Sequence, residues 1–248
     1  MLRSSRALLL AAISLSSFLA APAPAHAQAR KVLLIGVGGN SECRGGGIRE
    51  LMLDQEILQQ TLSGALRAAI DARYFSWTGD GVDSPGCLPG HLDWVLGGSA
   101  HIQASLRKEL RPGRSIAIVG WSNGGATAYE LACDLTKRGL QVKLLVTLDA
   151  AAWTTRPCRK GEGASIPVRP AQRWIAVYTE SEGFHKFLGT NLIGYFGRAW
   201  DDQFPYSPSE RADVLMKLKP ANHGDTMRMW TTCVAPTLRG DKVCNTRS

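Results

Sequence analysis

One serine in the chain stands where its hydroxyl could act as a nucleophile. Residues 120–124, Gly-Trp-Ser-Asn-Gly, form the pattern G-x-S-x-G with Ser122 at its centre. The apolar run of residues 115–119 comes directly before this pattern, and a stretch of helical character comes directly after it. A turn this tight between a buried strand and a helix needs small neighbours, and it pushes the middle side chain out at the carboxyl edge of the sheet. The alternative is a serine that only caps the helix.

At this pattern the chain resembles the α/β-hydrolase superfamily, and the resemblance in element order covers most of residues 28–248. It implies a catalytic serine, acid and histidine, in that order along the chain. His223 is the implied base, because it lies in a loop after the last predicted strand. The acid is Asp149 or Glu180, each of which directly ends a predicted strand. We prefer Asp149, because Asp is the commoner acid in such triads, and Glu180 stays open.

Acyl transfer also needs N–H donors for the oxyanion that develops on the substrate. The resemblance assigns this role to the backbone of Asn123, directly after the nucleophile, and to the loop after the first strand, where Gly39 lies. This chemistry calls for no metal and no organic cofactor. Residues 36–38, Gly-Val-Gly, resemble the start of a dinucleotide fingerprint, but Ser41 stands where the third Gly is expected.

The elements that must position these groups are predicted from apolar runs and helical spacing. Runs rich in aliphatic or aromatic residues predict six strands, at residues 31–37, 72–78, 115–119, 142–148, 173–179 and 214–218. The continuous run at 31–37 suits a strand buried on both faces of a parallel sheet. Helices are expected at 49–70, 100–110 and 123–138, and after His223. The alternation predicts an α/β fold: a mainly parallel sheet of about six strands with helices on both faces. The resemblance implies that this sheet is α/β-hydrolase-like, with no large lid domain.

Aromatic side chains gather in residues 184–206, between the last two predicted strands. Phe184, Phe187 and Trp121 are the candidates for an apolar substrate wall; the alternative is ordinary packing on the sheet. The expected activity is hydrolysis of a carboxylic ester, small or lipid-like, by an esterase or lipase-like enzyme. A thioesterase or peptidase could use the same triad. The competing class is a non-catalytic binding protein on this scaffold.

The first 27 residues read as a secretory signal peptide. Arg3 and Arg6 form a basic start, residues 7–20 are apolar, and Ala25-His26-Ala27 matches the cleavage pattern. We therefore expect a single domain over residues 28–248, exported to the periplasm or secreted. Stable membrane insertion is not expected, because no other segment approaches the roughly 20 apolar residues of a membrane span. The net charge is +8, without long runs of like charge, so nucleic-acid binding is not expected either.

Six cysteines in an exported chain make disulfides plausible, although the connectivity cannot be deduced from the sequence. Cys233 with Cys244 is the first expected pair, and Cys43 with Cys87 is the second. Cys133 lies inside a predicted helix and is expected to be a buried thiol. The oligomeric state is left open.

Overall fold

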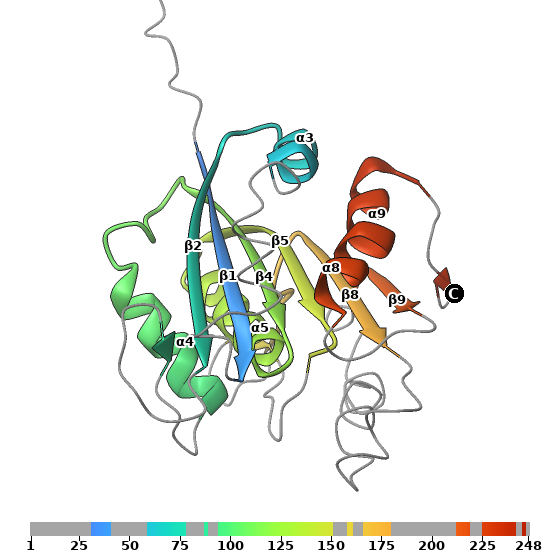
Figure 1. The fold of residues 1–248 in the computed structure, drawn as a ribbon. Coiled ribbons are helices and arrows are strands. Elements are labelled where there is room, and N and C mark those ends of the chain that lie inside the picture. The colour runs from blue at the N-terminus through green and yellow to red at the C-terminus, as the bar shows by residue number, and fades with distance from the viewer. Residues whose placement is uncertain are drawn as a thin grey trace, which may run out of the picture.

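A central, mainly parallel sheet organises the molecule. The computed structural model describes residues 31–40, 59–77, 87–88, 94–150, 158–160, 166–179, 212–218, 225–241 and 245–246. Within these residues an eight-stranded sheet has the order β10-β9-β8-β5-β4-β1-β2-β3 (Figure 1). Its strands are β1 (Val32–Asn40), β2 (Ile70–Trp77), β3 (Cys87–Leu88), β4 (Ser115–Trp121), β5 (Gln141–Leu148), β8 (Arg173–Thr179), β9 (Val214–Leu218) and β10 (Asn245–Thr246). Only the short β10 pairs antiparallel in this sheet, and β6 (Arg159–Lys160) with β7 (Ile166–Pro167) forms a separate antiparallel ladder.

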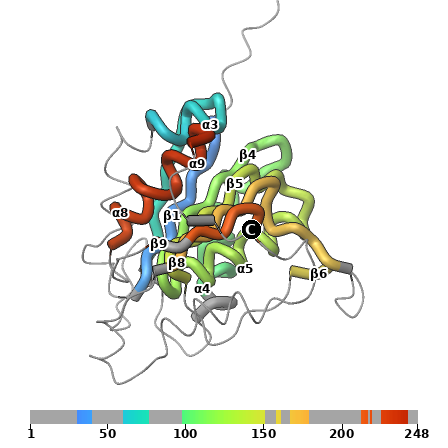
Figure 2. Tube along the Cα trace, turned by 90° about the vertical axis from the view of Figure 1, so that its right-hand side faces the viewer, coloured from blue at the N-terminus to red at the C-terminus, as the bar shows by residue number. Residues whose placement is uncertain are grey.

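Helices cover both faces of the sheet. Those of the described part are η2 (Gln59–Ser63), α3 (Gly64–Leu66), α4 (Trp94–Ser105), α5 (Asn123–Lys137), α8 (Thr226–Met229), η5 (Trp230–Val234) and α9 (Ala235–Arg239), where η marks a π-helical turn. Figure 2 shows α3, α8 and α9 together on one side of the sheet. The opposite face is packed by α4 and α5.

The core is split between these two faces because successive strand residues point in opposite directions. In β1, Leu33, Ile35 and Val37 pack with α4 and α5, whereas Val32 and Leu34 pack with the helices of the other face. All five side chains are buried. This is why the strand is apolar at every position instead of every second one.

The predicted fold class is confirmed. Each predicted strand is present at its place, and the predicted helices over 123–138 and after His223 are found as α5 and as α8 to α9. The helix predicted over 49–70 is wrong at its end. Its described part stops at Leu66, because Arg67 takes a left-handed backbone (φ 50°) and β2 already begins at Ile70.

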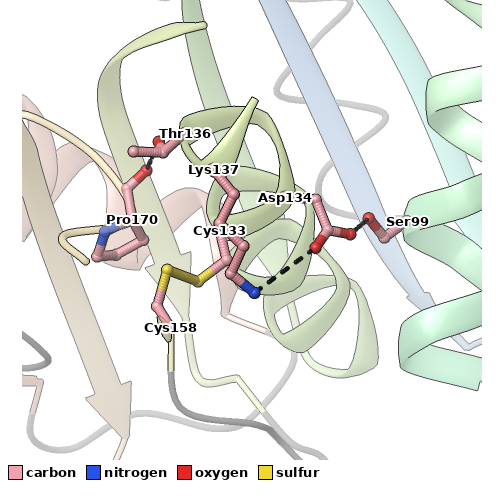
Figure 3. Close-up of a disulfide and its surroundings, with 7 residues drawn as sticks. All are labelled: Ser99, Cys133, Asp134, Thr136, Lys137, Cys158 and Pro170. Atoms are coloured by element: carbon pink, nitrogen blue, oxygen red, sulfur yellow. Dashed lines mark hydrogen bonds and ion pairs between the residues drawn. A yellow bond between two sulfur atoms is a disulfide. The ribbon is translucent and has the colours of Figure 1, made fainter. Parts of the chain in front are cut away.

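A disulfide joins Cys133 on α5 to Cys158, so the prediction that Cys133 is a buried thiol is wrong (Figure 3). The two Cα atoms are 5.5 Å apart across 25 residues of sequence. Helical spacing places Cys133 on the buried face of α5, but only the folded chain brings residue 158 beside it. Cys233 is disulfide-bonded too. Residues 43 and 244 lie outside the described residues, so the Cys233–Cys244 pair stays a prediction, as does Cys43–Cys87.

Two features predicted from the sequence lie outside what the structure describes: the signal peptide at residues 1–27 and the whole aromatic segment at 184–206. Of the helices in the described part, none has the length and apolar character that a membrane span needs.

A charged cluster stands at the amino edge of the sheet, away from the predicted site. Arg114 Nη2 lies 2.5 Å from Asp71 Oδ2, and Arg73 Nη1 lies 2.6 Å from Asp71 Oδ1. Glu109 joins the cluster through both arginines. Burial raises the pKa of Asp71, but hydrogen bonds and charge from Arg114 and Arg73 outweigh it and hold that pKa below its ordinary value of 3.8.

Replacement of Asp71 by Asn is expected to lower the free energy of unfolding by about 1 kcal/mol near neutral pH. A carboxylate with a lowered folded-state pKa adds stability above its unfolded pKa and loses it as the pH falls through the folded value. The gap between wild type and variant should therefore close as the pH drops below 3.8. Urea denaturation at several pH values measures it. Asp241→Asn is the control, because Asp241 pairs with Arg239 at an exposed site and should change little. A pH-independent gap would contradict this account.

Candidate active site

Ser122 occupies a sharp turn between β4 and α5, as the sequence pattern predicts. Its backbone has φ 54° and ψ −130°, a region that residues other than glycine rarely adopt. Its N–H donates to the carbonyl of Leu148 on β5 at 3.1 Å, and its own carbonyl accepts from the N–H of Gly125 at 2.9 Å. The turn is thus tied to the neighbouring strand on one side and to the helix start on the other. Ser122 is half-buried and lies at the carboxyl edge of the sheet.

Glycines allow the turn to close. A Cβ atom on Gly120 would come closer than 3.0 Å to the carbonyl of Gly124 and to Ala128. A Cβ on Gly124 would come equally close to the carbonyls of Val37 and Gly38 at the end of β1. The start of α5 therefore lies directly against the backbone of the first strand.

The two groups predicted to bind an oxyanion come from opposite sides of Ser122. Asn123 opens α5, so its N–H belongs to the first turn of that helix, where N–H groups point outward from the helix start. Gly39 approaches from β1: a Cβ built on it would lie 2.9 Å from Cβ of Ser122. The structure therefore brings Gly39, Ser122 and Asn123 together.

Asp149 lies beside the nucleophile on the neighbouring strand. Trp121 pairs in register with Leu148, so Ser122 and Asp149 each come directly after one member of the same pair. Adjacent strands are roughly 4.8 Å apart. Asp149 is 4% exposed, and its N–H donates to the carbonyl of Val177 on β8 at 2.6 Å. Its φ of 42° is again left-handed, so the backbone turns sharply at this residue as it does at Ser122.

These features decide the fold. The strands from β2 to β9 are parallel in the order β2-β1-β4-β5-β8-β9, and the strained turn with its serine follows β4 near the centre of the sheet. The chain has the α/β-hydrolase fold.

Several residues that the resemblance assigns to this fold's active site are not among those described. His223, Glu180, Phe184 and Phe187 all lie outside them, so their roles stay predictions. Trp121 is described: it is half-buried, and its indole ring lies against Gly39. In the part of the chain that the structure describes, no group of His, Cys, Asp or Glu could hold a metal ion.

Solved structures similar to this chain include a serine hydrolase, a thioesterase and a methylesterase. XC6422 from Xanthomonas campestris, an α/β serine hydrolase without a lid, has 14% identity and a TM-score of 0.46, over 88% of this chain and 84% of its own. The type II thioesterase BorB of the borrelidin biosynthetic cluster has 13% identity and a TM-score of 0.47, over 91% and 96%. The methylesterase MES16 from Arabidopsis has 15% identity and a TM-score of 0.44, over 84% and 98%. No family model and no curated protein matches the chain.

One residue at this edge was missed by the sequence reasoning. Ser76, near the end of β2, is fully buried and donates a hydrogen bond from Oγ to the carbonyl of Gly39 at 3.2 Å. The sequence does show a polar hydroxyl residue, Ser76, among the aromatic residues at the end of this predicted strand. Only the pairing of β1 with β2 shows which backbone group it serves.

Proposed function

We propose that the chain is an exported serine hydrolase that cleaves carboxylic esters. The observation that carries this proposal is the strained turn at Ser122, with Gly39 against its Cβ and the buried Asp149 following the paired strand. Backbone strain of this kind costs roughly 1–3 kcal/mol and persists where the surrounding structure enforces it. A serine that merely caps a helix does not need such strain, since ordinary caps have extended backbones.

The proposed mechanism has two acyl-transfer steps. His223 accepts the proton of Ser122 Oγ while that oxygen forms a bond to the ester carbonyl carbon, and the carbonyl electrons move onto oxygen. N–H groups at Asn123 and in the loop of Gly39 stabilise this oxyanion. The intermediate collapses, the C–O bond to the alcohol breaks, and His223 returns the proton to the leaving alcohol. Water then attacks the acyl-enzyme by the same route, with Asp149 orienting the imidazole.

A fluorophosphonate probe tests the proposal directly, because it reacts with serines that an adjacent base activates. We expect stoichiometric labelling at Ser122 and hydrolysis of p-nitrophenyl esters. Ser122→Ala should abolish both. The matched control is Ser115→Ala at the opposite end of the same strand β4, which should leave both unchanged. A folded wild type that neither labels nor hydrolyses esters would contradict the proposal and favour a non-catalytic binding protein. A series of acyl chain lengths defines the substrate class.

A further inference from the structure

The pairing of β1 with β2 is interrupted beside the nucleophile. Val37 pairs with Phe75, and the next pair is Asn40 with Trp77. Two residues of β1, Gly38 and Gly39, therefore face the single residue Ser76 of β2. This is a β-bulge, an irregularity that occurs next to active sites and changes the direction in which a backbone group points.

Ser76 supplies a side-chain donor at this bulge. It is 0% exposed, and its hydroxyl lies 3.2 Å from the Gly39 carbonyl oxygen. A hydrogen bond to a buried carbonyl is costly to lose, so this contact helps to constrain the peptide that joins Gly39 to Asn40. The Gly39 carbonyl is thereby held toward β2.

The same contact sets the direction of an N–H group. In a trans peptide the carbonyl and the following N–H point in opposite directions. Because the Gly39 carbonyl faces β2, the N–H of Asn40 points away from β2. Strand β1 lies between β2 and β4, so that direction leads toward the β4 side, where Ser122 stands.

The other side of this peptide is closed by the nucleophile's own turn. A Cβ on Gly39 would lie 2.8 Å from two atoms of the Trp121 ring and 2.9 Å from Cβ of Ser122. The peptide is thus enclosed between the Ser76 hydroxyl and the indole ring. Little rotation is open to it without breaking the hydrogen bond or displacing the ring.

We propose that Ser76 is a positioning residue for the oxyanion hole: its hydrogen bond to the Gly39 carbonyl aims the N–H of Asn40 at the oxyanion that forms beside Ser122. The inference rests on the proposed serine hydrolase function and refines it. The second donor is then the N–H of the residue after Gly39. Ser76 touches no substrate and acts only through this peptide.

Three variants at two sites test the proposal. Ser76→Ala removes the donor, and Ser76→Cys keeps the side-chain shape with a weaker donor. The matched control is Ser99→Ala, which removes another buried serine hydroxyl, one that donates to Asp134 on α5 at 2.8 Å. Active sites are counted with the fluorophosphonate probe, so that kcat refers only to folded, competent enzyme.

The readouts separate a positioning role from general damage. For an oxygen ester, Ser76→Ala should lower kcat about tenfold, less than the 10²–10³ lost with a whole donor, while KM stays nearly unchanged. Affinity for a trifluoromethyl ketone, which forms an oxyanion with the serine, should fall by the same factor. Hydrolysis of the matching thionoester, whose larger sulfur uses such a hole poorly, should change little. Ser76→Cys should lie between wild type and Ser76→Ala, and Ser99→Ala should match wild type.

Two results would overturn the inference while leaving the proposed function intact. One is wild-type kcat and wild-type inhibitor affinity in Ser76→Ala. The other is an equal loss on the oxygen ester and the thionoester, which would show a structural role only. A wild type that neither labels nor hydrolyses esters is a different result: it contradicts the proposed function and removes the basis of this inference with it.

Discussion

Asp149→Asn is expected to lower kcat for ester hydrolysis by about 10⁴-fold while the fold stays intact. An acid in this position accepts a hydrogen bond from the histidine base, holds the imidazole in the productive tautomer and stabilises its protonated form. Asn keeps the shape of Asp but removes the charge and replaces one oxygen with an N–H donor group. The expected loss of kcat therefore has two causes: the protonated imidazole loses a stabilising charge, and the histidine is no longer held in the productive tautomer.

The backbone conformation at residue 149 can accept Asn without strain. Asp149 has φ 42°, and Asn is among the few residues that tolerate left-handed backbone. Its N–H still donates to the carbonyl of Val177, so the end of β5 keeps its tie to β8. The matched control is Asp134→Asn, at the other end of α5, where the carboxylate accepts from Ser99. That variant should keep wild-type kcat.

Steady-state kinetics with active-site titration measure the effect. If Asp149→Asn keeps more than a tenth of the wild-type kcat and Glu180→Gln loses nearly all of it, the acid is Glu180 and the choice of Asp149 is wrong. If neither variant loses activity, the chain does not use a triad acid from β5 or β8. The experiment therefore decides between the two carboxylates that the sequence left open.

The sheet could be predicted from the sequence because the burial of each strand is visible in residues that are adjacent in the chain. Strands such as residues 142–148 are largely buried on both faces, and most of their positions are apolar without a two-residue alternation. The turn at Ser122 was equally readable, since the glycines that its geometry demands lie two residues on either side. Both features depend on neighbours in the chain.

The features that escaped prediction depend on pairing between distant segments. Cys133 was placed correctly on a helix, yet its partner Cys158 lies 25 residues further along the chain. The contact of Ser76 with Gly39 depends on one interruption in the β1–β2 register, and residue composition does not predict such an interruption. Propensity and periodicity carry no information on such contacts, because both describe one segment at a time.

Gly124→Ala is expected to damage stability and activity together. The added Cβ would come closer than 3.0 Å to the carbonyls of Val37 and Gly38, and both are backbone atoms in the buried strand β1 that cannot rotate away. Overpacking of this kind costs about 3 kcal/mol. For a domain of this size, that corresponds to a fall in Tm of roughly 6 to 12 °C.

The loss of activity has a separate cause. To relieve the clash, the start of α5 must move away from the end of β1, and Ser122 moves with it because it precedes the helix directly. The approach of Gly39 to Ser122 then widens, and donors on β1 no longer reach the oxyanion. We expect kcat per folded molecule to fall by about 10²-fold, as for the loss of one oxyanion donor.

Thermal denaturation and titrated kinetics measure the two effects of Gly124→Ala independently. Gly64→Ala is the control, since a Cβ there would meet nothing within 4 Å and alanine favours the helix. It should leave kcat unchanged and should not lower Tm. A Gly124→Ala protein with wild-type Tm and kcat would mean that the start of α5 can shift away from β1 without loss of stability or activity. The contact between α5 and β1 would then not be what holds Ser122 against Gly39.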